Sequence, residues 1–407
     1  MLPEGWRQCR MGDLFESRRE RGRPGLPLLS VTMNDGLVDR DDLDRKQDSA
    51  LTPEEHLLVK PGDIAYNMMR MWQGAFGLAD REGLVSPAYV VLKPKDSIHP
   101  AYAGQMLRTP RMLYLMWAYS YGLTDDRLRL YFPDFASIKV TVPTKQSQLR
   151  IAQYLETWDR AIDIQQRLVL NKERQRQALL LLLMTGDGGA PQVSRGLRIA
   201  LLGDLIGALE AGVSVNGLDR AAEQGEVGVL KISAVTSGIF DPSANKAIRP
   251  DEIARARVSP RADRILVSRC NTAELLGASA YVDADYLGLF LPDKLWQLKP
   301  KSPNVVHMRW LAYWLAAKTT RLKISSLATG SSGSMKNIAK DQFLALTVAV
   351  PQYAEQVRIA DALTDWDNAT ENLRRQTKLL ADEKLALASH FLSGNHDIPP
   401  MVVKAAR

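Results

Sequence analysis

The sequence predicts an α/β fold in which two globular α/β domains are joined by two long antiparallel helices that pair as a coiled coil, with a pseudo-twofold internal repeat. Three observations indicate this fold. A segment that starts at Pro143 recurs at Pro351, a displacement of 208 residues. Each copy continues for about forty residues without Pro or Gly, which favours a long helix. A stretch of mixed strand and helix signals precedes each copy.

The repeat organises the whole chain. PTKQSQLRIAQYLETWDRAID at 143–163 and PQYAEQVRIADALTDWDNATE at 351–371 share Gln, Arg-Ile-Ala, Leu, Trp-Asp and Ala at the same offsets. Upstream matches occur at smaller displacements, as for Gly12-Asp13-Leu14 and Gly203-Asp204-Leu205, so the globular parts have diverged in length. The expected regions are a first domain at 1–142, a central helical region at 143–190, a second domain at 191–350, a distal helical region at 351–394 and a tail at 395–407.

Both helical regions carry a stripe of residues at alternating spacings of four and three. A spacing close to 3.5 residues keeps one face of each helix against a partner helix. The first stripe is Ile151, Leu155, Trp158, Ile162, Gln165, Val169, Lys172, Arg176, Leu179 and Leu183. The second is Ile359, Leu363, Trp366, Thr370, Leu373, Thr377, Leu380, Lys384, Leu387 and Phe391. Each helix would be roughly 60 Å long. An ordinary bundle or a homodimeric coiled coil is the alternative, but the duplicated unit favours pairing within one chain.

Each globular stretch mixes short β-rich runs with turn signals and amphipathic helices. Strands are expected in LPLLSVT, AYVVLKP and KVTVP of the first domain, and in GVLKISAV, RILVSR and LTVAVP of the second. Asn34-Asp35-Gly36 and Ser237-Gly238 mark turns, and helices are expected near 100–119 and 306–323. No GxGxxG sequence follows a strand, so a Rossmann-type sheet is not predicted.

The charge distribution suggests a polyanionic partner. The 407-residue chain has a formal net charge of +7. Basic and acidic residues number 19 each in 1–142, against 20 basic and 14 acidic residues in 191–350. Cys9 and Cys270 lie outside any CxxC pattern, which argues against a disulfide framework and a thiolate metal site. The sequence has neither a signal-peptide pattern nor a long apolar run, so we expect a cytoplasmic protein with no membrane partner.

The sequence lacks recognisable catalytic motifs. A DNA methyltransferase needs a Gly-rich cofactor turn and a Pro-Pro-aromatic box for the flipped base, and Ile398-Pro399-Pro400-Met401 lacks the aromatic residue. A DNA motor needs GxxxxGK[ST], and no Gly-Lys pair occurs. The histidines show no metal-ligand spacing apart from His390 and His396, which flank a Gly near the end of the chain. We therefore expect a non-catalytic protein without a cofactor or a metal.

Several segments together resemble the specificity subunits of type I restriction-modification systems, over nearly the full chain. The strongest matches are the two Pro...Gln-x-Arg-Ile-Ala...Leu...Asp segments and GDIAYNMMRMWQGAFGLADREGLVSPAYVVLKP at 62–94. SVTMNDGLVDR at 30–40 and GSSGSMKNIAKDQF at 330–343 add to them. The first copy departs from the pattern at Ser147, where the second has Glu355, the acid usually found before the Gln. Loss of this helix-start carboxylate costs little stability.

The resemblance implies both an architecture and a set of partners. Two target-recognition domains would each bind one half of a split site on double-stranded DNA, and the helices between them would fix the gap. Two modification subunits, which carry the methyltransferase, would dock on those helices, and restriction subunits that translocate and cut DNA can join the complex. Because the two domains differ in sequence, the half-sites should differ and the whole site should be asymmetric.

Candidate DNA contacts follow from residue type and loop placement. Base reading needs side chains with paired donors or acceptors, and phosphate contacts need Arg, Lys, Ser or Asn near loops. The candidates in the first domain are Arg70, Trp72 and Gln73 of the NMMRMWQG turn, and Arg127 and Arg129 of the GLTDDRLR loop. Those in the second domain are Arg269, Asn271 and Thr272 of SRCNTAE, and Ser331, Ser332, Ser334, Lys336 and Asn337 of GSSGSMKN. The last loop is the best candidate, because Gly and Ser allow close backbone approach.

Other readings of these residues and of the chain stay open. Trp72 could be a core residue, Arg70 could pair with Asp63, and the run Arg18-Arg19-Glu20-Arg21 could be a solvated face. The chain could be an enzyme whose active site is not recognisable, in which case the isolated chain would transfer methyl groups or cut DNA. It could also be a scaffold or anti-restriction protein that binds the modification subunit without reading DNA. Mimics of DNA are acidic, and the excess of basic residues in 191–350 speaks against one.

Overall fold

The computed structural model describes residues 3–33, 35–43, 51–124, 127–185, 197–328 and 336–393. The chain divides into two compact units. Unit 1 comprises Met1–Arg167 and Arg374–Arg407, and unit 2 comprises Leu168–Leu373. Helices α5 (Lys145–Thr185) and α10 (Tyr353–Ser393) each contribute a part to both units.

The globular part of unit 1 contains short strands, short helices and 3₁₀ turns. Its strands are β1 Arg7–Arg10, β2 Phe15–Arg18, β3 Leu29–Val31, β4 Leu37–Asp39, β5 Leu57–Val59, β6 Ile64–Asn67, β7 Phe76–Leu78, β8 Gly83–Val85, β9 Tyr89–Pro94 and β10 Lys139–Val142. Its helical elements are α1 Met11–Leu14, η1 Arg40–Asp42, η2 Pro53–Glu55, η3 Met71–Gln73, α2 Pro100–Leu107, α3 Pro110–Ala118 and α4 Phe132–Ser137.

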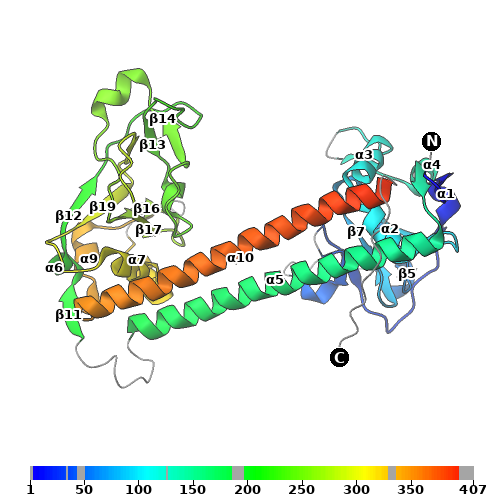
Figure 1. Cartoon of the computed structure of the whole chain (residues 1–407), viewed down its shortest axis with the longest axis horizontal. Helices are drawn as coiled ribbons and strands as arrows, with labels where there is room; N and C mark the ends of the chain where they lie inside the picture. The colour runs from blue at the N-terminus through cyan, green and yellow to red at the C-terminus, as the bar shows by residue number, and fades with distance from the viewer. Residues whose placement is uncertain are drawn as a thin grey trace. The chain divides into compact units, whose positions relative to one another are not determined.

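An antiparallel sheet with strand order β2-β9-β6-β7 forms the centre of unit 1. Buried side chains of the sheet and the surrounding helices form one core, which includes Phe15, Tyr66, Tyr102 and Phe135. Phe391 near the end of α10 joins this core, and its ring lies 5.3 Å from that of Tyr154 on α5. The last part of α10 and the first part of α5 are therefore packed into unit 1 (Figure 1).

Unit 2 has a comparable set of elements. Its strands are β11 Arg198–Leu201, β12 Ile206–Ala211, β13 Gly228–Leu230, β14 Asn245–Ala247, β15 Arg264–Ser268, β16 Cys270–Asn271, β17 Ser279–Val282, β18 Leu289–Phe290, β19 Leu295–Pro300, β20 Lys336–Asn337 and β21 Thr347–Val350. Its helical elements are α6 Leu202–Leu205, η5 Ile232–Val235, η6 Pro250–Arg255, α7 Met308–Ala316, α8 Lys318–Ser326 and α9 Lys340–Leu344.

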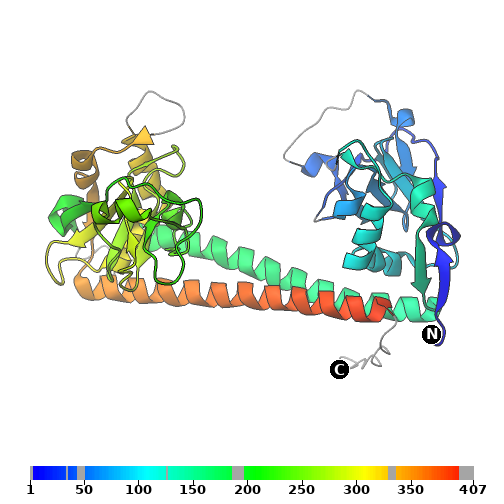
Figure 2. The same cartoon turned by 90° about the horizontal axis from the view of Figure 1, so that it is seen from above.

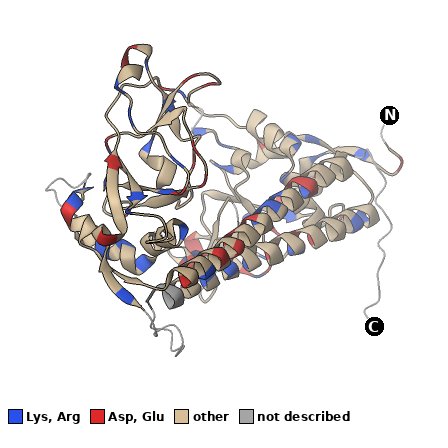
Figure 3. Cartoon of the chain, turned by 60° about the vertical axis from the view of Figure 1, so that its left-hand side comes forward, with Lys and Arg blue, Asp and Glu red and all other residues tan. Residues whose placement is uncertain are grey.

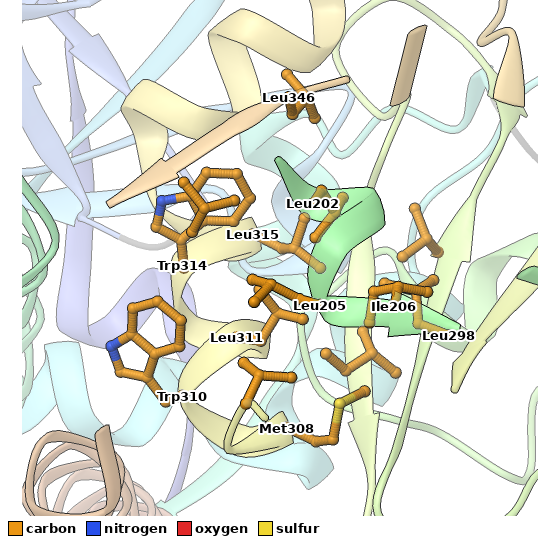
Figure 4. Packing of buried hydrophobic residues seen from close by; sticks show 14 of the residues in the cluster. Leu202, Leu205, Ile206, Leu298, Met308, Trp310, Leu311, Trp314, Leu315 and Leu346 are labelled. Atoms are coloured by element: carbon orange, nitrogen blue, oxygen red, sulfur yellow. The ribbon is translucent and has the colours of Figure 1, made fainter. Parts of the chain in front are cut away.

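The core of unit 2 lies between its sheet, with strand order β12-β19-β15-β17, and helix α7. Leu311 and Leu315 of α7 face Leu202 and Leu205 of α6 (Figure 4). Ile359 of α10 joins the same core. Burial of large apolar side chains is the main stabilising contribution to such a unit.

The two units repeat one framework, as the sequence repeat predicts. Both central sheets have the same order of equivalent strands, and β1 pairs with β10 as β11 pairs with β21. The same main-chain bonds recur: Met11 N donates to Ile138 O at 2.9 Å, and Leu202 N donates to Leu346 O at 2.8 Å. The predicted α/β class and internal repeat are confirmed.

Helices α5 and α10 confirm the helical prediction and the direction of pairing. Their bounds are displaced by 208 residues, as the two sequence segments are. In unit 1, Asp159 and Gln165 of α5 bond to Lys384 and Thr377 of α10, so the chain directions are opposed. In unit 2 the two helices also lie side by side (Figure 2), and Trp366 Nε1 donates to Lys172 O at 3.2 Å.

Burial supports the predicted stripes. Every stripe residue whose burial is described is buried or half-buried, whereas most positions between them are exposed. Figure 3 shows basic and acidic residues interspersed along both long helices. Supercoiling of the pair stays a prediction.

Among the described residues, the structure holds no helix with the length and apolar character that a membrane span requires.

The structure differs locally from the predicted elements. The helix expected near 100–119 is interrupted at Thr109, because Pro110 starts a new helix and Thr109 caps it by accepting from Met112 N at 3.3 Å. The helix expected near 306–323 is likewise interrupted at Ala317, whose backbone is extended. In GVLKISAV only Gly228–Leu230 is a strand, and Ile232–Val235 forms a 3₁₀ turn.

Candidate nucleic-acid interface

The first candidate turn, at 67–75, connects β6 and β7 of unit 1. Asn67 N donates to Ala75 O at 3.2 Å, Met69 N donates to Asn67 Oδ1 at 3.0 Å, and Gly74 takes a positive φ of 90°. A residue with a Cβ would be strained at this left-handed position, so the glycine makes the tight turn possible. The turn exposes Arg70 and Gln73.

The structure bears on the alternatives for Trp72, as a core residue, and for Arg70, as a partner of Asp63. Trp72 is half-buried, and its Nε1 donates to Met69 O at 3.1 Å. Asp63 pairs with Arg18, Nε to Oδ2 at 2.6 Å, and not with Arg70. The hydrogen bond to Asp63 raises the pKa of Arg18 above its usual range, and the Arg18 side chain is only 13% exposed. Arg18 is therefore not part of a solvated face, whereas Arg70 is exposed and available for a ligand.

The second candidate loop of unit 1 lies directly beside this turn. Leu130 N donates to Met68 O at 2.9 Å, and the Tyr66 hydroxyl donates to Leu130 O at 3.2 Å. Burial raises the pKa of Tyr66, so its hydroxyl keeps the proton that this bond needs. Arg129 exchanges main-chain bonds with Tyr121 at 2.9 and 3.1 Å. The structure thus brings Arg127 and Arg129, both exposed, to the same surface as the Arg70 turn.

Exposed aromatic side chains next to this surface were not singled out from the sequence. The residues are Tyr114, Trp117, Tyr119 and Tyr121, with exposed fractions between 37% and 63%. The ring centroids of Tyr114 and Trp117 on α3 lie 5.8 Å apart, and α3 packs against η3 of the Arg70 turn. Aromatic rings beside arginines suit both base stacking and cation–π contacts. The helical spacing of Tyr114 and Trp117 could equally mark a buried face, so the sequence carried no decisive signal for them.

In unit 2 the structure brings the two candidate segments together. Strand β16 pairs with β20 in antiparallel register, so Cys270 lies opposite Asn337 and Asn271 lies opposite Lys336. Thr272 follows β16 directly and is exposed. Ile338 N also donates to Arg269 O at 3.0 Å. Two segments more than sixty residues apart in sequence therefore form one surface.

Neighbouring elements hold the SRCNTAE segment in place. Arg269 Nε donates to Asp293 O at 2.7 Å, which gives this arginine a role in positioning the segment. Helix α8 supports the other end, because Arg321 Nη2 donates to Glu274 O at 2.9 Å and Ser325 Oγ donates to Ala273 O at 3.0 Å. Burial lowers the pKa of Arg321 below its usual range. A held main chain can present Asn271 and Lys336 at small entropic cost.

Ser331, Ser332 and Ser334 lie outside the described residues. Over the described ranges, His, Cys, Asp and Glu side chains form no cluster of metal-ligand type.

Part of the sequence matches a known protein family. The model of the type I restriction modification DNA specificity domain matches residues 253–381. The specificity subunit of the type I restriction enzyme EcoEI from Escherichia coli is 22% identical over 188 residues. That match covers 46% of this chain and 32% of the relative, so the matched stretch spans about a third of the relative's length.

Solved structures are similar over almost the whole chain. A chain from a study of complex assembly and conformational transition in the type I R-M system has a TM-score of 0.63 at 14% identity, covering 97% of this chain and all of that one. The type I restriction-modification system S subunit from M. genitalium has a TM-score of 0.57 at 14% identity, covering 98% of this chain and all of its own. These likenesses show the shared fold. The chain is therefore similar in fold to these structures over almost its whole length, and similar in sequence to the type I restriction modification DNA specificity domain over residues 253–381.

Proposed function

We propose that this protein is the sequence-reading subunit of a type I restriction-modification complex and recognises a split, asymmetric site on double-stranded DNA. Residues 1–142 and 191–350 are the two target-recognition domains, and the helical regions at 143–190 and 351–394 set the gap between the half-sites. Modification subunits that carry a methyltransferase dock on the helical regions, and restriction subunits can join them. Methyl transfer and DNA cleavage belong to those partners.

The observation that carries the proposal is one framework with two different surfaces. The main-chain bonds around β1 and β11, and the order of the central sheets, are the same in both units. The candidate surface of unit 1 combines Arg70, Arg127 and Arg129, whereas that of unit 2 combines Asn271 and Lys336. A repeated scaffold with unlike donors and acceptors is what reading two different half-sites requires.

The test uses this chain co-expressed with a methyltransferase subunit. Methylated adenines in genomic DNA are mapped by single-molecule sequencing for the wild type and for Asn271→Ala, Lys336→Ala and Arg129→Ala. The proposal expects a split motif whose second half alone changes in the Asn271 and Lys336 variants. Arg129→Ala is the matched control on the other unit and leaves that half unchanged.

Other outcomes identify the alternatives. A stable complex that methylates without any split motif, or does not methylate, indicates a scaffold that binds the modification subunit only. Methyl transfer by the isolated chain with a methyl donor and DNA indicates an enzyme. Either result rejects the proposed function.

A further inference from the structure

Asp159 on α5 lies at a junction of three elements in unit 1. Its Oδ2 accepts from Gln105 Nε2 of α2 at 2.8 Å, and its Oδ1 accepts from Lys384 Nζ of α10 at 2.6 Å. The Lys384 side chain is half-buried, with 16% of it exposed. One carboxylate therefore links the globular part of the unit to both long helices.

Asp367 on α10 occupies the equivalent junction in unit 2. Its Oδ2 accepts from the Tyr313 hydroxyl of α7 at 3.0 Å, and its carboxylate pairs with Arg176 of α5 through Nε and Nη2. Burial raises the pKa of Tyr313 to about 12, so the hydroxyl stays protonated and can donate near neutral pH. The Arg176 guanidinium also lies over the Tyr313 ring, 5.8 Å from its centroid.

The two junctions are related by the repeat, although their donors differ. Gln105 and Tyr313, Asp159 and Asp367, and Arg176 and Lys384 are each separated by 208 residues. The acceptor is Asp in both copies, whereas the helix of the globular part supplies an amide in one and a phenol in the other. The geometry is thus repeated with different chemistry, which indicates that the arrangement matters more than the donor type.

Each globular part is also attached at a second point along the same helix. In unit 1, Gln148 Oε1 accepts from His99 N, at the start of α2, at 2.8 Å. In unit 2, Gln356 Oε1 accepts from His307 N, at the start of α7, at 2.7 Å. The glutamine precedes the aspartate by the same number of residues in both copies, so the attachment points lie roughly 16 Å apart along the helix.

Two separated attachments constrain a direction that one attachment leaves free. The apolar core that each globular part shares with the long helices holds α2 or α7 against them, but apolar contact is not directional, whereas two polar attachments at separate points fix a direction. We propose that Asp159 and Asp367 are positioning residues, each of which fixes the direction of its globular part on the helix pair through a donor, a carboxylate and a cation from three different elements. This inference needs only the contacts above, whereas its consequence for DNA reading rests on the proposed function.

The test measures the direction of the globular part in the full-length protein without DNA. Spin labels are placed at two exposed positions of unit 1, Asp80→Cys and Gln166→Cys, in a background of Cys9→Ala and Cys270→Ala. Pulsed electron–electron double resonance gives the distribution of distances between the two spin labels. A fixed globular part gives one narrow distribution, and a pivoting one gives a broad distribution.

The decisive variants first add a repulsive charge to the junction and then reverse the signs of its charges. Gln105→Glu at pH 8 places a second carboxylate against Asp159, and we expect the narrow distribution to be lost. Adding Asp159→Lys and Lys384→Asp to Gln105→Glu recreates the junction with opposite charges, and we expect the narrow distribution to return. Gln153→Glu, an exposed position on α5, is the matched control and leaves the distribution unchanged.

Rescue shows that charge repulsion at the junction, and not the new side chain at position 105 itself, causes the broadening, and a melting curve of each variant shows that the labelled protein is folded. A second measurement in unit 2 uses Tyr313→Phe, which removes only the hydroxyl that donates to Asp367, with labels at Leu287→Cys and Asn368→Cys, and we expect a broader distribution than in the labelled wild type. The inference is overturned if Gln105→Glu keeps the narrow distribution or if the triple variant stays broad. Fixed directions without any split methylation motif would leave the inference standing and reject the proposed function.

Discussion

Truncating the buried amides Gln148 and Gln356 tests how firmly the globular parts are held. Each side chain is 1% exposed. Gln356 Nε2 donates to Pro351 O at 2.9 Å, and its Oε1 accepts from His307 N. Alanine removes both hydrogen bonds and leaves the main-chain N–H of His307 without an acceptor. We therefore expect the free energy of unfolding to fall by about 3 kcal/mol. For a unit of this size the midpoint temperature should fall by about 6–12 °C.

Differential scanning calorimetry and urea titration measure this loss. Gln352→Ala is the matched control four residues earlier, because that side chain is exposed, and Gln153→Ala serves the same purpose for Gln148→Ala. Both controls should change the free energy of unfolding by less than about 0.5 kcal/mol. If Gln148→Ala and Gln356→Ala lower the free energy of unfolding no more than the controls do, the reasoning that these amides hold α2 and α7 is refuted.

Three further substitutions probe the surfaces and the charge pairs. Lys336→Ala should weaken specific DNA binding about tenfold and relax only the second half of the motif, which anisotropy titrations with half-site mutants measure. Arg129→Ala should lower affinity for all sequences and reduce the slope of log affinity against log salt by about 1, as a salt titration shows. The hydrogen bond from Arg220 lowers the pKa of Glu226 to about 2, so its stabilisation is present above the ordinary value of 4.5 and is lost as pH falls towards 2. Glu226→Gln should therefore show a smaller drop in melting temperature between pH 7 and pH 3 than the wild type.

The repeat, the long helices and the broad class of the fold could be predicted because their signals are local. The Pro143 and Pro351 segments share identical residues at the same offsets without a gap, and the stripes follow a fixed spacing. Short helices were less accessible, since Pro110 both continues an amphipathic pattern and starts a new helix. Ala317 carries no breaking signal of its own, so the interruption of the helix there could not be predicted from the sequence.

The composition of the candidate surfaces could be predicted only in part. Residue type and loop placement singled out Arg70, Arg129, Asn271 and Lys336, but nothing in the sequence indicates that Asn271 lies opposite Lys336. Register between short strands far apart in the chain depends on the whole unit. The Gln105 and Tyr313 junctions were hidden for a different reason, because their donors are unlike residues and only the structure shows that they bond to equivalent carboxylates.

The two units separate the residues that hold the framework from those that present a surface. Two glutamines and two aspartates on the long helices hold α2 and α7. Gln148 and Gln356 bond to the residue just before each helix, and Asp159 and Asp367 bond to a side chain within it. The candidate contacts lie on other elements, in turns and short strands. Substitutions that change what a surface binds can therefore leave the attachment of the unit intact, because additivity holds between distant sites with no shared partners. Under the proposed function, a chain built this way can acquire a new half-site in one unit while the other unit keeps its own.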